Sequence, residues 1–161
     1  MTRIRLIAAA AVASLAIAGC GGGDDGESNA GLSYSELGTE MNKICTEYDP
    51  KVDAATDKLQ GKATEDAAVF DEIVPIIEEG TGKFKALDPP SELQADFDNF
   101  ISLADQTVAL IKKAQTAAKS GDQQEYVTVA KEIRDSPLDE QSDEAASKLG
   151  AAECIDDGET S

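Results

Sequence analysis

The chain has 161 residues, of which 14 are Lys or Arg and 32 are Asp or Glu, so its formal net charge is −18. This balance argues against nucleic acid and against an anionic membrane surface as binding partners, because both are bound by a surplus of Lys and Arg. The chain contains no His, which excludes every catalytic or metal site that depends on imidazole. Its length suits one domain rather than two.

Residues 1–19 have the pattern of a secretory signal. Arg3 and Arg5 form a short basic region, and an apolar run from Leu6 to Ala18 follows them. The run is shorter than the about 20 residues that a transmembrane helix needs. A buried helix of the fold is the alternative, but the lack of acidic residues before Asp24 argues against it.

The end of this segment, Leu15-Ala16-Ile17-Ala18-Gly19-Cys20, resembles the lipobox of bacterial lipoproteins, although Ile17 stands where Leu is commonest. The resemblance implies cleavage before Cys20, diacylglycerol on its sulfur and a fatty acyl group such as palmitate on the new amino group. The mature chain would then be anchored in the lipid bilayer on the extracytoplasmic face of the cell membrane; secretion without the lipid is the alternative. Removing Arg3 and Arg5 leaves 12 basic and 32 acidic residues, a net charge of −20.

Residues 20–31 are rich in Gly and acidic residues and have no apolar periodicity, so we expect a flexible linker. We interpret Asp24 and Asp25 as solvated residues of this linker rather than as a cation site. The folded domain is expected to span residues 32–155, and residues 156–161 to form a disordered acidic tail.

Apolar residues recur every three or four positions through the folded domain, which predicts an all-α structure. We expect helices over residues 33–59, 64–87, 91–120 and 122–150. Their apolar stripes contain Leu37, Met41, Ile44, Tyr48, Val52, Ala55 and Leu59; Phe70, Ile73, Ile77, Phe84 and Leu87; Leu93, Phe97, Phe100, Ala104, Ile111, Ala114 and Ala118; and Tyr126, Ala130, Ile133, Leu138, Ala145 and Leu149. Short connections make neighbouring helices antiparallel, so the predicted architecture is an up-down-up-down four-helix bundle.

Local signals mark where these helices begin and end. Ser33 with Glu36, and Asp122 with Glu125, have the spacing of a capping box. Gly121 is expected to end the third helix. The prolines should disturb the helices, since each removes a backbone N–H. We expect a kink or short break near Pro50, a weakened middle around Pro75, and a kink or split at Pro137.

Cys45 and Cys154 form an even pair in a chain that we expect to be exported, where disulfides persist. If the first and fourth helices are antiparallel, Cys154 must return by about 16 Å along the first helix. The residues after Gly150 can span about 15 Å when extended. We therefore predict a Cys45–Cys154 disulfide, with two buried free thiols as the alternative.

The segments Ile44-Cys45, Leu87-x-Pro89-Pro90, Gly121-Asp122 and Leu149-Gly150-x-x-x-Cys154, in this order, resemble small Cys-paired helical lipoproteins of high-GC Gram-positive bacteria. The similarity covers about residues 33–154. It implies a helical fold and a membrane location. The group has no assigned activity, so the resemblance supplies no functional residues.

The sequence contains no arrangement typical of a catalytic site. Ser has no His to activate it, and no Gly-x-Ser-x-Gly turn occurs. Ser147 and Lys148 are adjacent and cannot face each other on a helix. Paired carboxylates of a glycoside hydrolase remain conceivable, but sugar sites usually stack aromatic rings and the chain has no Trp. We expect a protein that is not an enzyme.

Two acidic clusters raise the question of a cation site, because carboxylate oxygens are the preferred ligands of Ca²⁺ and Mg²⁺. They consist of Asp49, Asp53 and Asp57, and of Asp139, Glu140, Asp143 and Glu144. No segment matches an EF-hand loop, and we interpret both clusters as solvated helix faces without a metal. Tyr34, Tyr48 and Tyr126 could in principle bind haem. The position of Tyr48 on an apolar stripe instead favours a packed ring, so we expect no cofactor.

Two functions remain. The first is a membrane-tethered, non-catalytic interaction module that presents an acidic surface to another envelope protein. The alternative is a lipoprotein that binds a small ligand or cation in a pocket between helices opened by the prolines. A filled core would favour the first, and an apolar pocket inside the bundle would favour the second.

Overall fold

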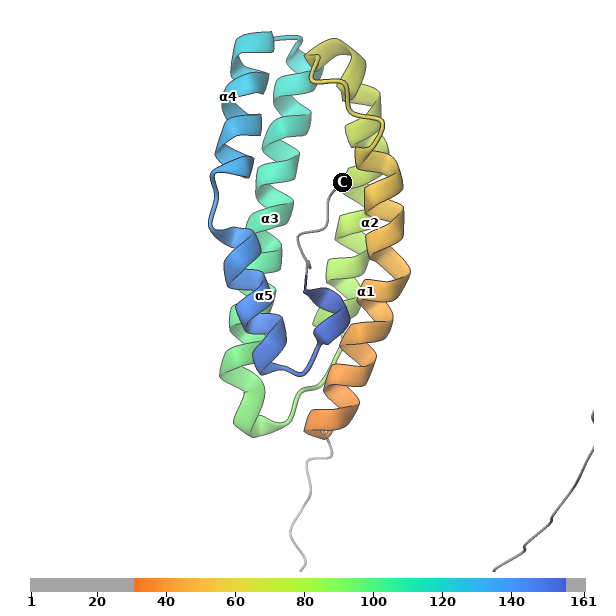
Figure 1. Ribbon diagram of the computed structural model, residues 1–161, viewed down its shortest axis with the longest axis vertical. Helices are drawn as coiled ribbons and strands as arrows, with labels where there is room; N and C mark the ends of the chain where they lie inside the picture. Colours follow the sequence, from red (N-terminus) through yellow and green to blue (C-terminus); the bar gives the residue numbers. More distant parts are fainter. Residues whose placement is uncertain (1–30, 156–161) are drawn as a thin grey trace, which may run out of the picture.

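The computed structural model describes residues 31–155. The predicted signal peptide, the lipidation site Cys20, nearly all of the linker and the acidic tail lie outside the described residues. Within them the chain forms helices and no strand, which confirms the predicted all-α bundle. The elements are α1 (Tyr34–Thr56), α2 (Ala63–Lys85), η1 (Ser91–Leu93), α3 (Gln94–Ser120), α4 (Gln123–Arg134), α5 (Leu138–Lys148) and η2 (Ala152–Cys154). Successive rods run up and down, with α4 and α5 stacked end to end as the fourth rod (Figure 1).

Helix α1 begins with the predicted capping box. The Ser33 hydroxyl accepts a hydrogen bond from the Glu36 backbone N–H at 3.4 Å, and the Glu36 carboxylate accepts one from the Ser33 N–H at 2.9 Å. The Ser33 hydroxyl also donates to the Glu36 carboxylate, and these bonds lower the pKa of Glu36. Leu32 and Leu37 pack in the same core cluster on either side of this cap. At the start of α4, the Asp122 side chain accepts hydrogen bonds from the N–H groups of the second and third helical residues.

The three prolines within the predicted helices have different outcomes. Helix α1 continues through Pro50, and helix α2 continues through Pro75, so the short break considered at Pro50 is absent. Both rings lie on exposed sides of their helices, where the loss of one N–H leaves a carbonyl open to water. Pro137 does divide the fourth rod: α4 ends at Arg134 and α5 begins at Leu138.

The core has two clusters, one near each end of the bundle. The cluster at the end where α1 begins contains Leu37, Met41, Phe97, Phe100, Leu103, Leu138, Ala145, Ala146, Leu149 and Ala151. The cluster at the opposite end contains Ala55, Ala63, Phe70, Ile73, Ala114, Ala117, Ala118, Tyr126 and Val129. Most of the large residues in both clusters belong to the predicted apolar stripes, so hydrophobic periodicity identified the inward faces. Alanines make up much of the second cluster, which lets the helices approach closely there.

Helices α2 and α3 are joined by a ladder of three ion pairs. The pairs are Asp71–Lys119, Glu78–Lys112 and Lys85–Asp105. Successive pairs are seven residues apart on both helices, and the sign of the charges is reversed in the third pair. Each pair is about half exposed and is therefore worth at most about 1 kcal/mol. The regular spacing nevertheless favours one antiparallel register, because a shift of one heptad would place like charges opposite each other at one position.

Candidate functional site

Cys45 of α1 and Cys154 of η2 form a disulfide with a Cα–Cα distance of 5.2 Å. This confirms the predicted pairing and excludes the alternative of two free thiols. The bridge joins the C-terminal turn to the first helix across 109 residues of sequence. In the described part of the chain, helix α1 makes most of its contacts with α2 and, after that, with η2. The disulfide therefore lies where the two ends of the domain meet.

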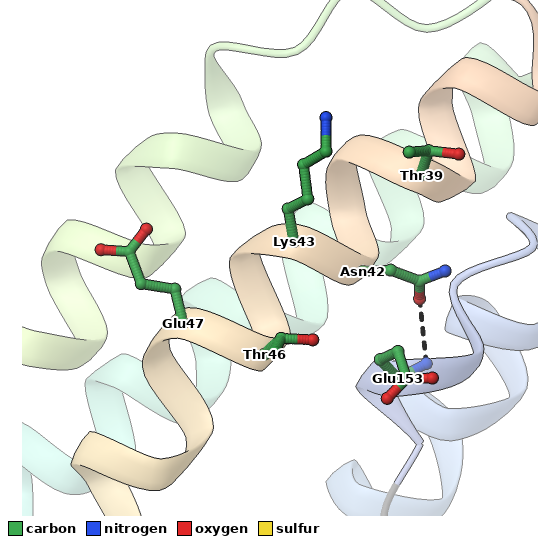
Figure 2. Close-up of a pocket in the computed structure, with 6 residues that line it drawn as sticks. All are labelled: Thr39, Asn42, Lys43, Thr46, Glu47 and Glu153. Atoms are coloured by element: carbon green, nitrogen blue, oxygen red, sulfur yellow. Dashed lines mark hydrogen bonds between the residues drawn. The ribbon is translucent and has the colours of Figure 1, made fainter. Parts of the chain in front are cut away.

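Two glycines allow the chain to turn back toward Cys154. Gly150 has a φ of +73°, a left-handed conformation that residues with a Cβ rarely adopt. A Cβ at Gly38 would lie 2.7 Å from the carbonyl oxygen of Gly150, so the backbones of α1 and this turn touch without a side chain between them. The Asn42 side-chain oxygen then accepts a hydrogen bond from the Glu153 N–H at 2.9 Å, which fixes η2 against α1 (Figure 2).

A hollow of about 510 Å³ lies beside this junction. Figure 2 shows the residues that line it: Thr39, Asn42, Lys43, Thr46, Glu47 and Glu153. The lining is polar and mostly exposed. Lys43 pairs with Glu40 at 2.6 Å, and Glu47 pairs with Lys51 at 3.0 Å, so both charged groups of α1 in this hollow are already engaged along the helix surface. All six lining side chains are polar, and no apolar side chain is among them.

The two acidic clusters do not come together as metal sites. Asp53 and Asp57 are exposed on α1, and Glu144 of the second cluster pairs with Lys148 at 2.9 Å. Among residues 31–155, no group of three or more His, Cys, Asp or Glu side chains could hold a metal ion. Asp49 and Asp143 have interactions of their own within the domain. Most residues of the two clusters are exposed on the surfaces of α1 and α5.

Tyr48 has the packed environment that its position on the apolar stripe predicts. Its side chain is 5% exposed, and its hydroxyl donates a hydrogen bond to Glu79 at 2.7 Å. This bond and the burial of the ring raise the pKa of Tyr48 to about 12. The ring lies between Lys51, whose ammonium is 4.3 Å from the ring centroid, and Gly80. A phenol held in this way is a structural contact between α1 and α2.

Asp66 is the main polar residue of the interior that the sequence analysis missed. Its carboxylate is fully buried and accepts hydrogen bonds from the N–H groups of Gln60, Gly61 and Lys62 at 2.8, 2.8 and 3.1 Å, and from the Tyr126 hydroxyl at 2.7 Å. Burial alone would raise the pKa of Asp66, but the four hydrogen bonds outweigh burial and hold it below its ordinary value. The pKa of Tyr126 is raised by burial and by this bond.

The sequence does contain a signal for this buried carboxylate. Ala63, Asp66, Phe70 and Ile73 follow one another at spacings of three, four and three, so Asp66 lies on the apolar stripe of α2. An acidic residue on an inward face requires a compensating set of donors. The donors come from the loop before α2 and from α4, a combination that helix periodicity does not reveal.

Comparison with known proteins finds no family model, no curated protein and no solved structure that matches the chain. None of the helices within residues 31–155 is both long and apolar enough to span a bilayer.

Proposed function

We propose that this protein is a lipoprotein, anchored in the membrane through acylated Cys20 on the extracytoplasmic face, whose helical domain is a non-catalytic interaction module for another envelope protein. The observation that carries the proposal is the division of the three cysteines. Cys45 and Cys154 bond to each other. Cys20 is the remaining cysteine, and it ends the segment that resembles a lipobox.

The disulfide also supports an extracytoplasmic location, because disulfides persist in oxidising compartments and are rare in the cytosol. Cys45 and Cys154 come from the two ends of the domain, so they meet only when the bundle is assembled. A structural bridge of this kind suits a protein that folds after export. The apolar run before Cys20 supplies the matching export signal.

Surface charge supports a binding role with a partner of opposite charge. Of the 12 basic residues beyond Cys20, ten form ion pairs with acidic side chains of the same domain. The remaining carboxylates outnumber the free cations and give the surface a negative potential, which attracts and orients a basic partner. The interior polar groups Tyr48, Asp66 and Tyr126 are used in structural hydrogen bonds.

The anchor is tested with Cys20→Ala. We expect the variant to be released from membranes or to accumulate as uncleaved precursor, whereas the double variant Cys45→Ala with Cys154→Ala stays in the membrane fraction. Cell fractionation measures the location, and the intact mass of the wild type should correspond to a lipid-bearing chain that starts at Cys20. Mature, membrane-free wild type that retains Met1 would contradict the anchor.

The interaction role is tested separately by crosslinking in intact cells. Asp139→Lys with Glu140→Lys reverses charge on α5, and Asp53→Lys with Asp57→Lys makes the same net change on α1. We expect one defined envelope protein to crosslink to the wild type and to one of the two variants but not to the other. Identical crosslinking patterns for the wild type and both variants, at equal abundance, would contradict a charge-dependent partner surface on these helices.

A further inference from the structure

A second hollow lies between α3 and the joint that connects α4 to α5. Its volume is about 690 Å³, within the range of roughly 300–1,000 Å³ that small-molecule sites occupy. Pro137 has no N–H, and the Ser136 N–H bonds to the Ile133 carbonyl at 3.1 Å instead of continuing the helix. The helix is therefore interrupted between Arg134 and Leu138, and residues of α3 line the hollow beside this interruption.

Four of the ten residues that line this hollow are apolar, and we refer to these four as its floor. Ala109 and Leu110 contribute from α3, and Pro137 and Leu138 contribute from the joint and the start of α5. Leu110 is half-buried and Leu138 is 9% exposed, so each has one side packed in the protein and an edge that faces the hollow. An apolar group that covers these side chains displaces water from them, which favours binding.

The rim favours a positive charge. Its charged side chains are Lys113, Glu132 and Asp135. Lys113 pairs with Glu132 at 2.5 Å, so the Asp135 carboxylate is the charge that the rim offers to a ligand. The C-terminal end of α4 opens on the same rim, and the end of a helix has a partial negative charge from its free carbonyl groups. Lys131 lies near Asp135, at 3.4 Å, but both side chains are more than half exposed, so this pair is weak enough to be exchanged.

We propose that the hollow binds small apolar compounds that contain a protonated primary amine, with the apolar body over Leu110 and Leu138 and the ammonium in place of Lys131 at Asp135. The floor would contact the apolar body of the compound, and Asp135 on the rim would pair with its ammonium group. The site goes beyond the anchored interaction module and does not depend on the lipid at Cys20.

The test uses three probes of one shape: cyclohexylamine, which is protonated at pH 7, cyclohexanol and cyclohexanecarboxylate. Each is titrated into the full chain with ¹³C-labelled Leu methyl groups. We expect cyclohexylamine to shift the Leu110 and Leu138 signals saturably, without shifting Leu59, which packs against the other core cluster. It should bind about fivefold more tightly than cyclohexanol, as expected for one added charged contact, and cyclohexanecarboxylate should bind more weakly than either.

Three variants locate the contacts. Asp135→Asn should weaken cyclohexylamine about fivefold and leave cyclohexanol unchanged, whereas Lys131→Gln should strengthen cyclohexylamine by removing its competitor. Ala109→Trp should fill the hollow and abolish binding, while the same change at exposed Ala95, in the first turn of α3, should not. Absence of saturable shifts, equal affinity for the three probes, or undiminished binding in a folded Ala109→Trp variant would overturn the proposal.

Discussion

Asp66 has the largest expected effect of any single polar residue in the described domain. Its carboxylate accepts bonds from three backbone N–H groups and from Tyr126, and water cannot replace it at a fully buried position. We expect Asp66→Asn to lower the free energy of unfolding by about 3 kcal/mol. The NH₂ group of Asn would face N–H or O–H donors where the second carboxylate oxygen of Asp66 accepts hydrogen bonds. Urea denaturation at pH 7 measures the change. Asp71→Asn is the matched control on α2; its ion pair with Lys119 is exposed, so its loss should cost at most about 1 kcal/mol.

The same carboxylate predicts a pH dependence. Its pKa is lower in the folded chain than in the unfolded chain, so its contribution to stability is complete above the unfolded value of about 4. That contribution is lost as the pH falls through the folded pKa. The difference in stability between wild type and Asp66→Asn should therefore shrink below pH 4. A difference that stays constant down to pH 2 would show that ionisation of Asp66 is not its source.

Residues with local partners could be predicted from sequence, and residues with distant partners could not. Ser33 and Glu36 are three positions apart, and their capping box is visible in the sequence alone. Asp66 takes one of its four hydrogen bonds from Tyr126, 60 residues away. Similarly, the Gln123 side chain accepts from the Ala63 N–H and donates to the Gly61 carbonyl, contacts that depend on how two loops meet.

At the scale of elements, we expect replacement by Ala to have opposite effects on the melting temperature at Gly38 and at Gly82. Both lie inside helices, where Ala is favoured over Gly by up to about 1 kcal/mol. A Cβ at Gly38 meets the Gly150 carbonyl oxygen at 2.7 Å, whereas a Cβ at Gly82 has nothing within 4 Å. We expect Gly38→Ala to lower the melting temperature and Gly82→Ala to raise it. Thermal unfolding followed by circular dichroism measures both, and a stabilised Gly38→Ala would contradict the close approach of α1 to the turn.

The disulfide is the covalent link between α1 and η2. Closure of a 109-residue loop should stabilise the fold by about 4–5 kcal/mol in the chain-entropy model. Cys45→Ala with Cys154→Ala should lower the free energy of unfolding by up to this amount. A reducing agent should produce the same loss in the wild type and none in the double variant. An effect of the reductant on the double variant would point to a different target.

At the scale of the whole molecule, apolar periodicity and short connections together predicted the bundle. The stripes containing Leu37, Phe70 and Phe100 all face the core, and short connections left one arrangement of neighbours. Apolar periodicity did not predict which prolines interrupt a helix. Pro50 and Pro137 are both exposed, yet α1 continues through Pro50, whereas before Pro137 the Ser136 N–H bonds to the Ile133 carbonyl and a new helix begins at Leu138. The hollow at this joint follows from that local difference.

The high negative charge predicts how the whole domain responds to salt. Repulsion among surplus carboxylates opposes the compact state, and at about 0.15 M salt the screening length is near 8 Å. NaCl and CaCl₂ at equal ionic strength should therefore raise the melting temperature by similar amounts. Micromolar Ca²⁺ should have no effect, because it is too dilute to screen. A rise at micromolar Ca²⁺ that is removed by a chelator, and by Asp139→Asn with Asp143→Asn, would instead demonstrate a specific site.

The Cys45–Cys154 bond also determines how the domain responds to mechanical force. The chain between these cysteines is a closed loop, with only about three turns of α1 before it and one described residue, Ile155, after it. A pull applied between the two termini passes from the start of α1 through the sulfur atoms and out along the C-terminal segment. Only the first turns of α1 can unravel under that load. Helices α2 to α5 lie inside the loop, outside the line of tension, and keep their fold while the ends are stretched.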